Sequence, residues 1–235
     1  VEEALLSEEE IKALIISKSM ANDQNVIELV RKAEQRNSSI KLCSVPDNMF
    51  KNLSDTQTPQ GVIAVVKMKA YNLNDAVGRN NGKNNLFIIL DAVQDPGNMG
   101  TIIRTADAAG FNAVIAGKGC VDIYNPKVLR STMGSIFHIP VIETDDLSHA
   151  INYLKSKGIK IYASHLNGMK NYYELNLSHD IAFIVGNEAN GISDQIAALA
   201  DCLIKIPMYG RAESLNAAIA AGILMYEVVR QISNN

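Results

Sequence analysis

The last two thirds of this 235-residue chain alternate short apolar segments with helical patterns, and this alternation constrains the fold more than any other feature. The apolar segments are nearly continuous runs of aliphatic and β-branched residues, such as LFIIL at 86–90 and IAFIV at 181–185. Strands of this kind are buried on both faces, as in parallel sheets that helices cover on each side. The sequence therefore predicts an α/β fold with a parallel sheet, in which ligands bind beyond the carboxyl ends of the strands.

The predicted elements divide the chain into two domains. We expect a small α/β domain over residues 1–70, with helices at 7–18, 25–36 and 46–53 and strands at 40–45 and 61–66. The first of these helices is predicted from Ser7 and Glu10, which have the spacing of a capping box. Residues 71–85 are polar and rich in Asn and Gly, which is typical of a linker. The larger domain, 86–235, is predicted to hold strands at 86–90, 113–116, 138–141, 159–163, 181–185 and 202–206, and helices at 100–109, 127–133, 146–157, 194–199 and 215–231.

Composition excludes several classes of protein. Hydrophobic residues make up 47% of the chain and charged residues 20%, which is typical of a globular protein and not of a disordered one. The three cysteines are far apart and the four histidines are scattered, so we expect neither a disulfide framework nor a metal site. No long apolar run or leader-like start is present, and we therefore expect a cytoplasmic protein without a membrane segment. With a net charge of −3, a nucleic-acid partner would need a local basic groove.

Three loops carry residues that suggest a site. The first, DPGNMGTIIRTADAAG at 95–110, follows a predicted strand. Asn98 can cap the next helix, and Arg104 lies away from the buried stripe of that helix. Taken alone, this loop is explained better by a simple cap and a solvated charge than by a site. The loop has neither the G-x-G-x-x-G pattern of dinucleotide sites nor a Walker-type lysine, so neither kind of phosphate site is predicted.

The second loop is GNEANGIS at 186–193, in which two glycines flank the single carboxylate of Glu188. Such a turn lets backbone amides approach a ligand, although a plain turn before a helix capped by Ser193 would look the same.

The third loop and the helix after it read IPMYGRAESLNAAIAAG at 206–222. We expect Ser214 to be the N-cap of that helix and Asn216 to lie in its first turn. The helix is apolar almost all round, which indicates burial on two sides, in the core and in a subunit interface.

Together the three loops resemble the SpoU/TrmH family of S-adenosylmethionine-dependent RNA ribose 2′-O-methyltransferases, of the SPOUT class, over about residues 85–232. The first domain resembles the L30e-like RNA-binding domain that often precedes it, and the nearest subgroup is the TsnR-like 23S rRNA methyltransferases. The resemblance implies a deep trefoil knot in the C-terminal domain, a homodimer formed through that domain, S-adenosylmethionine as cofactor and RNA, most closely 23S rRNA, as substrate. By motif position it implies cofactor contacts from Gly186, Ile206, Met208 and Leu215, and a catalytic and substrate-facing set of Asn98, Arg104, Glu188, Ser214 and Asn216.

The acid–base chemistry of a guanidinium limits the roles that Arg104 could have in methyl transfer. A guanidinium stays protonated in proteins, so we interpret Arg104 as a fixed positive charge that binds a phosphate and stabilises the developing alkoxide, and not as a base. The proton acceptor stays open, and an RNA phosphate could serve. Glu188 is interpreted as an organiser of the pocket.

Three alternatives remain at this point. A tRNA ribose methyltransferase would carry the same motifs, and mapping of 2′-O-methyl sites would distinguish it. A catalytically silent RNA-binding relative would fail to transfer a labelled methyl group. An NAD-dependent oxidoreductase would need the glycine fingerprint and the acidic residue that this sequence lacks.

Overall fold

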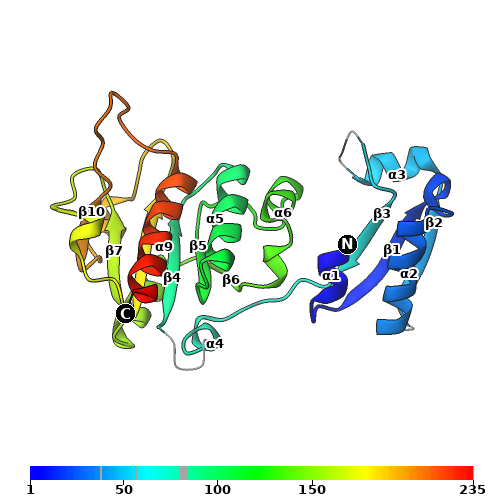
Figure 1. The fold of residues 1–235 in the computed structure, drawn as a ribbon, viewed down its shortest axis with the longest axis horizontal. Helices are drawn as coiled ribbons and strands as arrows, with labels where there is room; N and C mark the ends of the chain where they lie inside the picture. Colours follow the sequence, from blue (N-terminus) through cyan, green and yellow to red (C-terminus); the bar gives the residue numbers. More distant parts are fainter. Residues whose placement is uncertain (38, 55, 57, 80–83, 235) are drawn as a thin grey trace. The chain divides into compact units, whose positions relative to one another are not determined.

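A computed structural model describes the whole chain except residues 38, 55, 57, 80–83 and 235 (Figure 1). The chain divides into two compact units, Val1–Ala70 and Tyr71–Asn235, and each is described by itself. Among the described residues, no helix is long and apolar enough to cross a membrane, and no three His, Cys, Asp or Glu side chains form a group that could hold a metal ion.

The N-terminal unit is built on a three-stranded mixed sheet with the order β2-β1-β3. The central strand β1 is parallel to β2 and antiparallel to β3. The elements are α1 (Glu2–Leu6), β1 (Ile11–Ser17), the 3₁₀ helix η1 (Lys18–Met20), α2 (Gln24–Arg36), β2 (Lys41–Val45), α3 (Asp47–Ser54) and β3 (Val62–Val66). The strands and helices after residue 24 agree with the predictions to within about two residues.

The helix predicted over residues 7–18 is wrong, because residues 11–17 form the central strand β1. Ser7 does not start a helix; its hydroxyl donates to the Ala4 carbonyl at the end of α1. A short, continuous apolar run fits a buried helix and a buried strand equally well by pattern alone. Pairing with neighbouring strands on both edges selects the strand here.

The C-terminal unit holds a seven-stranded sheet, parallel throughout, with the order β6-β5-β4-β9-β7-β10-β8. Its strands are β4 (Leu86–Asp91), β5 (Ala113–Gly117), β6 (Val141–Thr144), β7 (Lys160–Ser164), β8 (Lys170–Asn171), β9 (Ile181–Gly186) and β10 (Cys202–Lys205). Its helices are α4 (Leu73–Ala76), α5 (Pro96–Ala108), α6 (Pro126–Thr132), α7 (Leu147–Ser156), α8 (Asp194–Ala197) and α9 (Ala217–Ser233), with 3₁₀ turns η2 (Ser135–Phe137) and η3 (Tyr172–Glu174). The predicted α/β fold with a parallel sheet is confirmed.

Helices cover both faces of this sheet. One apolar core joins α5, α6 and α9 to one face, and a second joins α4, α7 and α8 to the other. Figure 1 shows α5 and α9 running next to each other across the sheet, and the two helices pack together. The trefoil knot stays a prediction, because strand order does not establish how the chain is threaded.

Most elements of this unit shift by only one or two residues from the predictions, but β8, η2 and η3 were not predicted, and three further differences are larger. Part of the segment expected as a linker folds as α4, with Ala76 buried against the second core. The third strand, predicted at 138–141, lies at Val141–Thr144 because η2 and a turn occupy the residues before it. Helix α5 begins at Pro96, four residues earlier than predicted, since proline suits the first turn, where its missing N–H is not needed.

Candidate active site

The first and second loops begin side by side, at the carboxyl ends of two neighbouring central strands. Strands β4 and β9 pair in register from Leu86 with Ile181 to Asp91 with Gly186, so both end at the same level. The chain leaves β4 toward α5 and leaves β9 toward a short turn at residues 187–191. The register of two buried strands thus brings together loops that are more than ninety residues apart in the sequence.

Glu188 binds the start of α5. Its carboxylate accepts hydrogen bonds from the backbone N–H groups of Gln94 (3.2 Å) and Asp95 (3.1 Å) and from the Asn98 side-chain amide (2.9 Å). Burial alone would raise the pKa of Glu188, but these hydrogen bonds outweigh it and lower the pKa below its ordinary value. The carboxylate therefore stays ionised at neutral pH and is a weak proton acceptor, which suits an organiser and not a general base.

Asn98, in the first loop, joins the second loop to the third. It is buried, and its side-chain oxygen accepts a 2.8 Å hydrogen bond from the side-chain amide of Asn216. The expectation that Asn98 caps α5 is wrong. The N-cap is Asp95, whose carboxylate accepts a 2.8 Å hydrogen bond from the Asn98 backbone N–H. The side chain of Asn98 is thus available to join Glu188 to Asn216.

The cap of α9 also differs from the prediction. Asn216, and not Ser214, is the N-cap, and its side chain accepts from the backbone N–H groups of Ala218 and Ile219. Ser214 is exposed two residues earlier, in the loop before the helix. Three of the five residues expected in the catalytic set, Asn98, Glu188 and Asn216, therefore form one hydrogen-bonded chain across the three loops.

The turn after β9 is closed tightly. Asn187 and Gly191 exchange two backbone hydrogen bonds of 2.9 Å, and a Cβ atom built on Gly186 would lie 2.2 Å from the carbonyl carbon of Gly191. No side chain fits at residue 186, so the glycine is required by the close approach of backbone to backbone. The Asn187 side-chain amide also donates to the Ala92 carbonyl at 2.8 Å.

A cavity of about 400 Å³ opens beside this turn. Six of the nine predicted site residues line it: Gly186, Glu188, Ile206, Met208, Ser214 and Leu215. Asn98 and Asn216 are not among the lining residues and act on the cavity through Glu188 and α9.

Arg104 also lies outside the lining. It is exposed in α5, and it has no ion-pair partner in the part of the chain that the structure describes. Its guanidinium is therefore available to an external anion.

Two features of the site were missed from the sequence. Asp91 is buried at the end of β4 and accepts 2.8 Å hydrogen bonds from both the N–H and the hydroxyl of Ser193, which fixes the end of the second loop. Ser164, the last residue of β7, and residues 165–167 after it line a further side of the cavity. A carboxylate directly after an apolar strand is a usable signal for the first feature, whereas the segment after β7 carries no motif.

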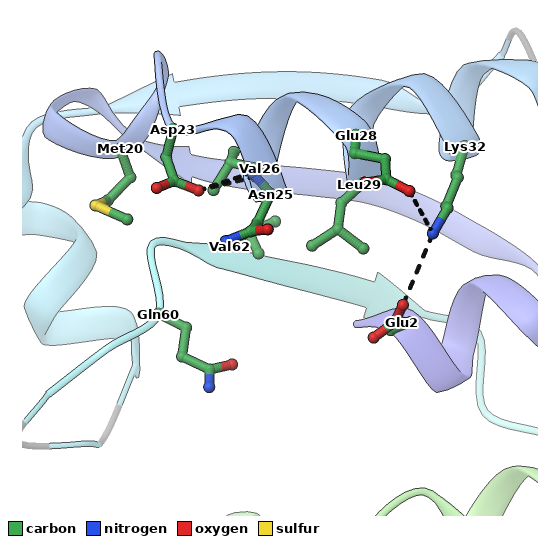
Figure 2. A pocket seen from close by; sticks show the side chains of 10 residues that line it. All are labelled: Glu2, Met20, Asp23, Asn25, Val26, Glu28, Leu29, Lys32, Gln60 and Val62. Carbon is green, nitrogen blue, oxygen red and sulfur yellow. Dashed lines mark hydrogen bonds and ion pairs between the residues drawn. The ribbon is translucent and has the colours of Figure 1, made fainter.

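A second cavity, of about 450 Å³, lies in the N-terminal unit between α2 and the start of β3. Figure 2 shows Lys32 between the carboxylates of Glu28 and Glu2, at 2.9 Å and 3.7 Å. The Asp23 carboxylate faces the start of α2 and caps it. The lining of this cavity carries three carboxylates and one lysine, so its net charge is negative and disfavours binding of an anion such as phosphate.

Comparisons with known proteins agree with this geometry. Residues 85–226 match the SpoU rRNA Methylase family, and residues 1–72 match the domain described as RNA 2′-O ribose methyltransferase substrate binding. The chain is 38% identical over 219 residues to the 23S rRNA (guanosine(2553)-2′-O)-methyltransferase RlmP of Bacillus subtilis, covering 91% of this chain and 85% of that one.

Solved structures give the same result. The SpoU methyltransferase AviRb of Streptomyces viridochromogenes, in complex with the cofactor AdoMet, superposes with a TM-score of 0.86 at 26% identity, covering 100% of this chain and 88% of that one. The AdoMet-bound rRNA methyltransferase of Sinorhizobium meliloti superposes with a TM-score of 0.85 at 31% identity, covering 98% and 84%. The fold, the three loops and these matches agree, and the chain belongs to the SpoU rRNA methylase family.

Proposed function

We propose that this chain transfers a methyl group from S-adenosylmethionine to a ribose 2′-hydroxyl of rRNA, most closely 23S rRNA. The observation that carries the proposal is the cavity that the second and third loops line together and that the first loop supports through the bond between Asn98 and Glu188. The named activities of the relatives support the same chemistry, and the match of residues 1–72 to a substrate-binding domain supports an RNA substrate.

The residues present suit the cofactor. The volume is within the usual range for small-molecule sites, and Ile192, Ile206, Met208 and Leu215 provide apolar contacts. The carboxylates of Glu188 and Glu213 outnumber the single lysine, Lys205, and such a lining favours a cationic sulfonium. When bound, S-adenosylmethionine would supply an electrophilic methyl group at this site.

We assign distinct roles to the polar residues. Arg104 binds a phosphate of the RNA and offers a fixed positive charge to the developing alkoxide. Glu188, Asn98 and Asn216 are positioning residues, because their hydrogen bonds to one another hold the loops at the cavity. Ser214 is exposed on the cavity lining, and we assign it to contact the reacting groups when they are bound.

We further infer a cytoplasmic homodimer that forms through α9. Ile219 is 54% exposed and Tyr226 is 50% exposed on that helix, and Met133, just after α6, is 67% exposed. Because α5 packs against both α6 and α9, these side chains belong to neighbouring elements on one face of the sheet. Apolar side chains exposed together on one face indicate an interface.

Labelled-methyl transfer tests the proposal. The purified chain is incubated with S-adenosylmethionine and, in separate reactions, with unmodified 23S rRNA and unmodified tRNA transcripts. We expect methylation of rRNA at a ribose 2′-hydroxyl. Methylation of tRNA alone would favour the tRNA alternative, and no transfer to either RNA would favour the silent relative.

Arg104→Ala separates the assigned roles. Because Arg104 does not line the cavity, this variant should lose methyl transfer while calorimetry shows unchanged affinity for S-adenosylmethionine. Loss of cofactor affinity would contradict the role proposed for Arg104.

A further inference from the structure

Two tyrosines are exposed beside the cavity, one within the third loop and one on a segment outside all three loops. Tyr209 is 89% exposed in the loop after β10, and Tyr173 is 46% exposed in the turn η3 after β8. Strands β8 and β10 pair in parallel, with Ile204 opposite Lys170, so both tyrosines follow neighbouring strands at one edge of the sheet.

The strand pairing places the two tyrosines in neighbouring segments: Lys205, four residues before Tyr209, lies opposite Asn171, two residues before Tyr173. Interaction with Tyr209 is also the largest cause of the raised pKa of the Tyr173 phenol. Tyr172, partly buried against the core, supports Tyr173 from behind, with ring centroids 5.2 Å apart at 74°. Tyr173 is therefore held by packing, while much of its surface stays open to solvent.

Positive charge accompanies the rings. Lys170 and Lys205 both act on the Glu174 carboxylate, which follows Tyr173 directly, although hydrogen bonds from Asn171 are the larger cause of its lowered pKa. Arg211 is exposed two residues after Tyr209. Met169, 88% exposed, adds apolar surface just before β8.

This aromatic and basic patch, defined by Met169, Lys170, Tyr173, Lys205, Tyr209 and Arg211, adjoins the cavity. Lys205 itself lines the cavity, and so does Met208, the residue before Tyr209. A ligand that extends out of the cavity on the side of β10 would therefore pass beside the loop that carries Tyr209.

We propose that Tyr209 and Tyr173 form a stacking platform for an unpaired RNA base next to the methylated ribose. The inference rests on the proposed function and adds to it the form of the substrate: the target strand is unpaired at the site. Exposed aromatic rings flanked by Lys and Arg are the combination that binds single-stranded nucleic acid, in which rings stack on bases and cations contact phosphates. A protein partner would not require cations along the same edge as the rings, and a duplex would keep its bases stacked internally.

Binding to RNA tests the inference without catalysis. The probe is a fluorescein-labelled single-stranded RNA of about 12 nucleotides, compared at fixed salt with a blunt duplex of the same sequence. We expect Tyr209→Ala and Tyr173→Ala each to weaken binding of the single strand by about tenfold, with a change below about twofold for the duplex. Tyr209→Phe and Tyr173→Phe keep the ring and should bind the single strand like the unaltered protein.

Two controls make the result specific. Tyr153→Ala removes a tyrosine of α7 that lies outside the cavity and the patch, and should not change RNA binding. Affinity for S-adenosylmethionine, measured by calorimetry, should stay unchanged in all the tyrosine variants and also shows that they fold. In methyl transfer to 23S rRNA, the alanine variants should raise KM for RNA and leave kcat at saturating RNA within about twofold.

Several outcomes would overturn the inference. Equal weakening of single-strand and duplex binding would assign the patch to backbone contacts alone, and weaker cofactor binding would place Tyr209 on the cofactor. Unchanged single-strand binding in the alanine variants would exclude the platform even if the enzyme methylates rRNA. If instead the unaltered protein transfers no methyl group, the proposed function fails while the binding result still decides whether the platform exists.

Discussion

The side-chain amide of Asn216 donates a 2.8 Å hydrogen bond to the side-chain oxygen of Asn98, which joins residues 118 positions apart in the sequence. The same Asn98 side chain donates to Glu188 at 2.9 Å, so one buried amide uses its oxygen toward α9 and its nitrogen toward the turn after β9. An amide is the side chain that can accept on one side and donate on the other in this way. The position of the cavity walls therefore depends on a group that is not itself among the residues lining the cavity.

Asn98→Asp should show this dependence. Aspartate can still accept from Asn216 but places a negative charge against Glu188, so we expect a loss of about 2 kcal/mol of stability and at least about tenfold lower methyl transfer. Urea unfolding and initial rates are the measurements. Adding Glu188→Gln gives the aspartate a donor and should recover part of the stability; a double variant no more stable than Asn98→Asp would show that the Asn98–Glu188 bond is not the cause.

Stability should depend on pH through Glu188. Its pKa is lowered in the folded protein, so its contribution is present above the unfolded value of about 4.3 and is lost as pH falls through the folded value. The melting temperature of Glu188→Gln should therefore lie below that of the unaltered protein at pH 7, and the difference should shrink toward pH 3. A constant difference across this range would contradict the assignment. Between pH 6 and 9 the relative methyl-transfer rates should keep the same pH profile in both proteins.

Gly186 and Gly210 provide a matched pair in the cavity wall and the loop beside it. Gly186→Ala places a methyl group 2.2 Å from the Gly191 carbonyl carbon, whereas a Cβ at Gly210 meets nothing within 4 Å. We expect Gly186→Ala to cost about 1–3 kcal/mol and to weaken binding of S-adenosylmethionine. Thermal melting and calorimetry should show little change in Gly210→Ala, and equal effects at both positions would exclude the close backbone approach as the reason.

The proposed dimer can be tested at the exposed face of α9. Ile219→Glu places charge in the proposed interface, and light scattering after size exclusion should show a shift from dimer to monomer. Ile27→Glu is the control, because Ile27 is 51% exposed on α2 of the N-terminal unit against 54% for Ile219. A monomeric unaltered protein, or a dimer that survives Ile219→Glu, would argue against an interface there.

Much of the fold follows from local pattern because buried parallel strands have a strong signature. Runs such as Leu86–Asp91 and Ile181–Gly186 are buried at every residue, and pattern reasoning located both to within one residue. Ile11–Ser17 has a similar composition but was predicted as a helix, since the polar residues before it imitate a cap. Its pairing with strands more than twenty residues away decides its conformation, and no local pattern contains that information.

Six of the nine residues that the motifs single out line the cavity, but the contacts among the nine could not be predicted. Gly186, Met208 and Leu215 line the cavity as their motifs indicate. The caps were assigned to Asn98 and Ser214, whereas the structure uses Asp95 and Asn216, because several Asp, Asn and Ser residues near each helix start have similar capping preferences. Which of these residues is the N-cap depends on where the first turn of the helix begins. The hydrogen bond between Asn98 and Asn216 joins two distant loops, so neither loop alone could predict it.

The bond between Asn98 and Asn216 also has a consequence for the order of events during synthesis. A nascent chain that has reached residue 210 already contains β4, α5 and the turn after β9, yet Asn98 lacks its donor and the cavity lacks the wall that Ser214, Leu215 and Ala217 provide. Competence to bind the methyl donor would then arise only after α9 has emerged from the ribosome and docked. An unfinished chain, even one with its sheet in place, would hold no cofactor.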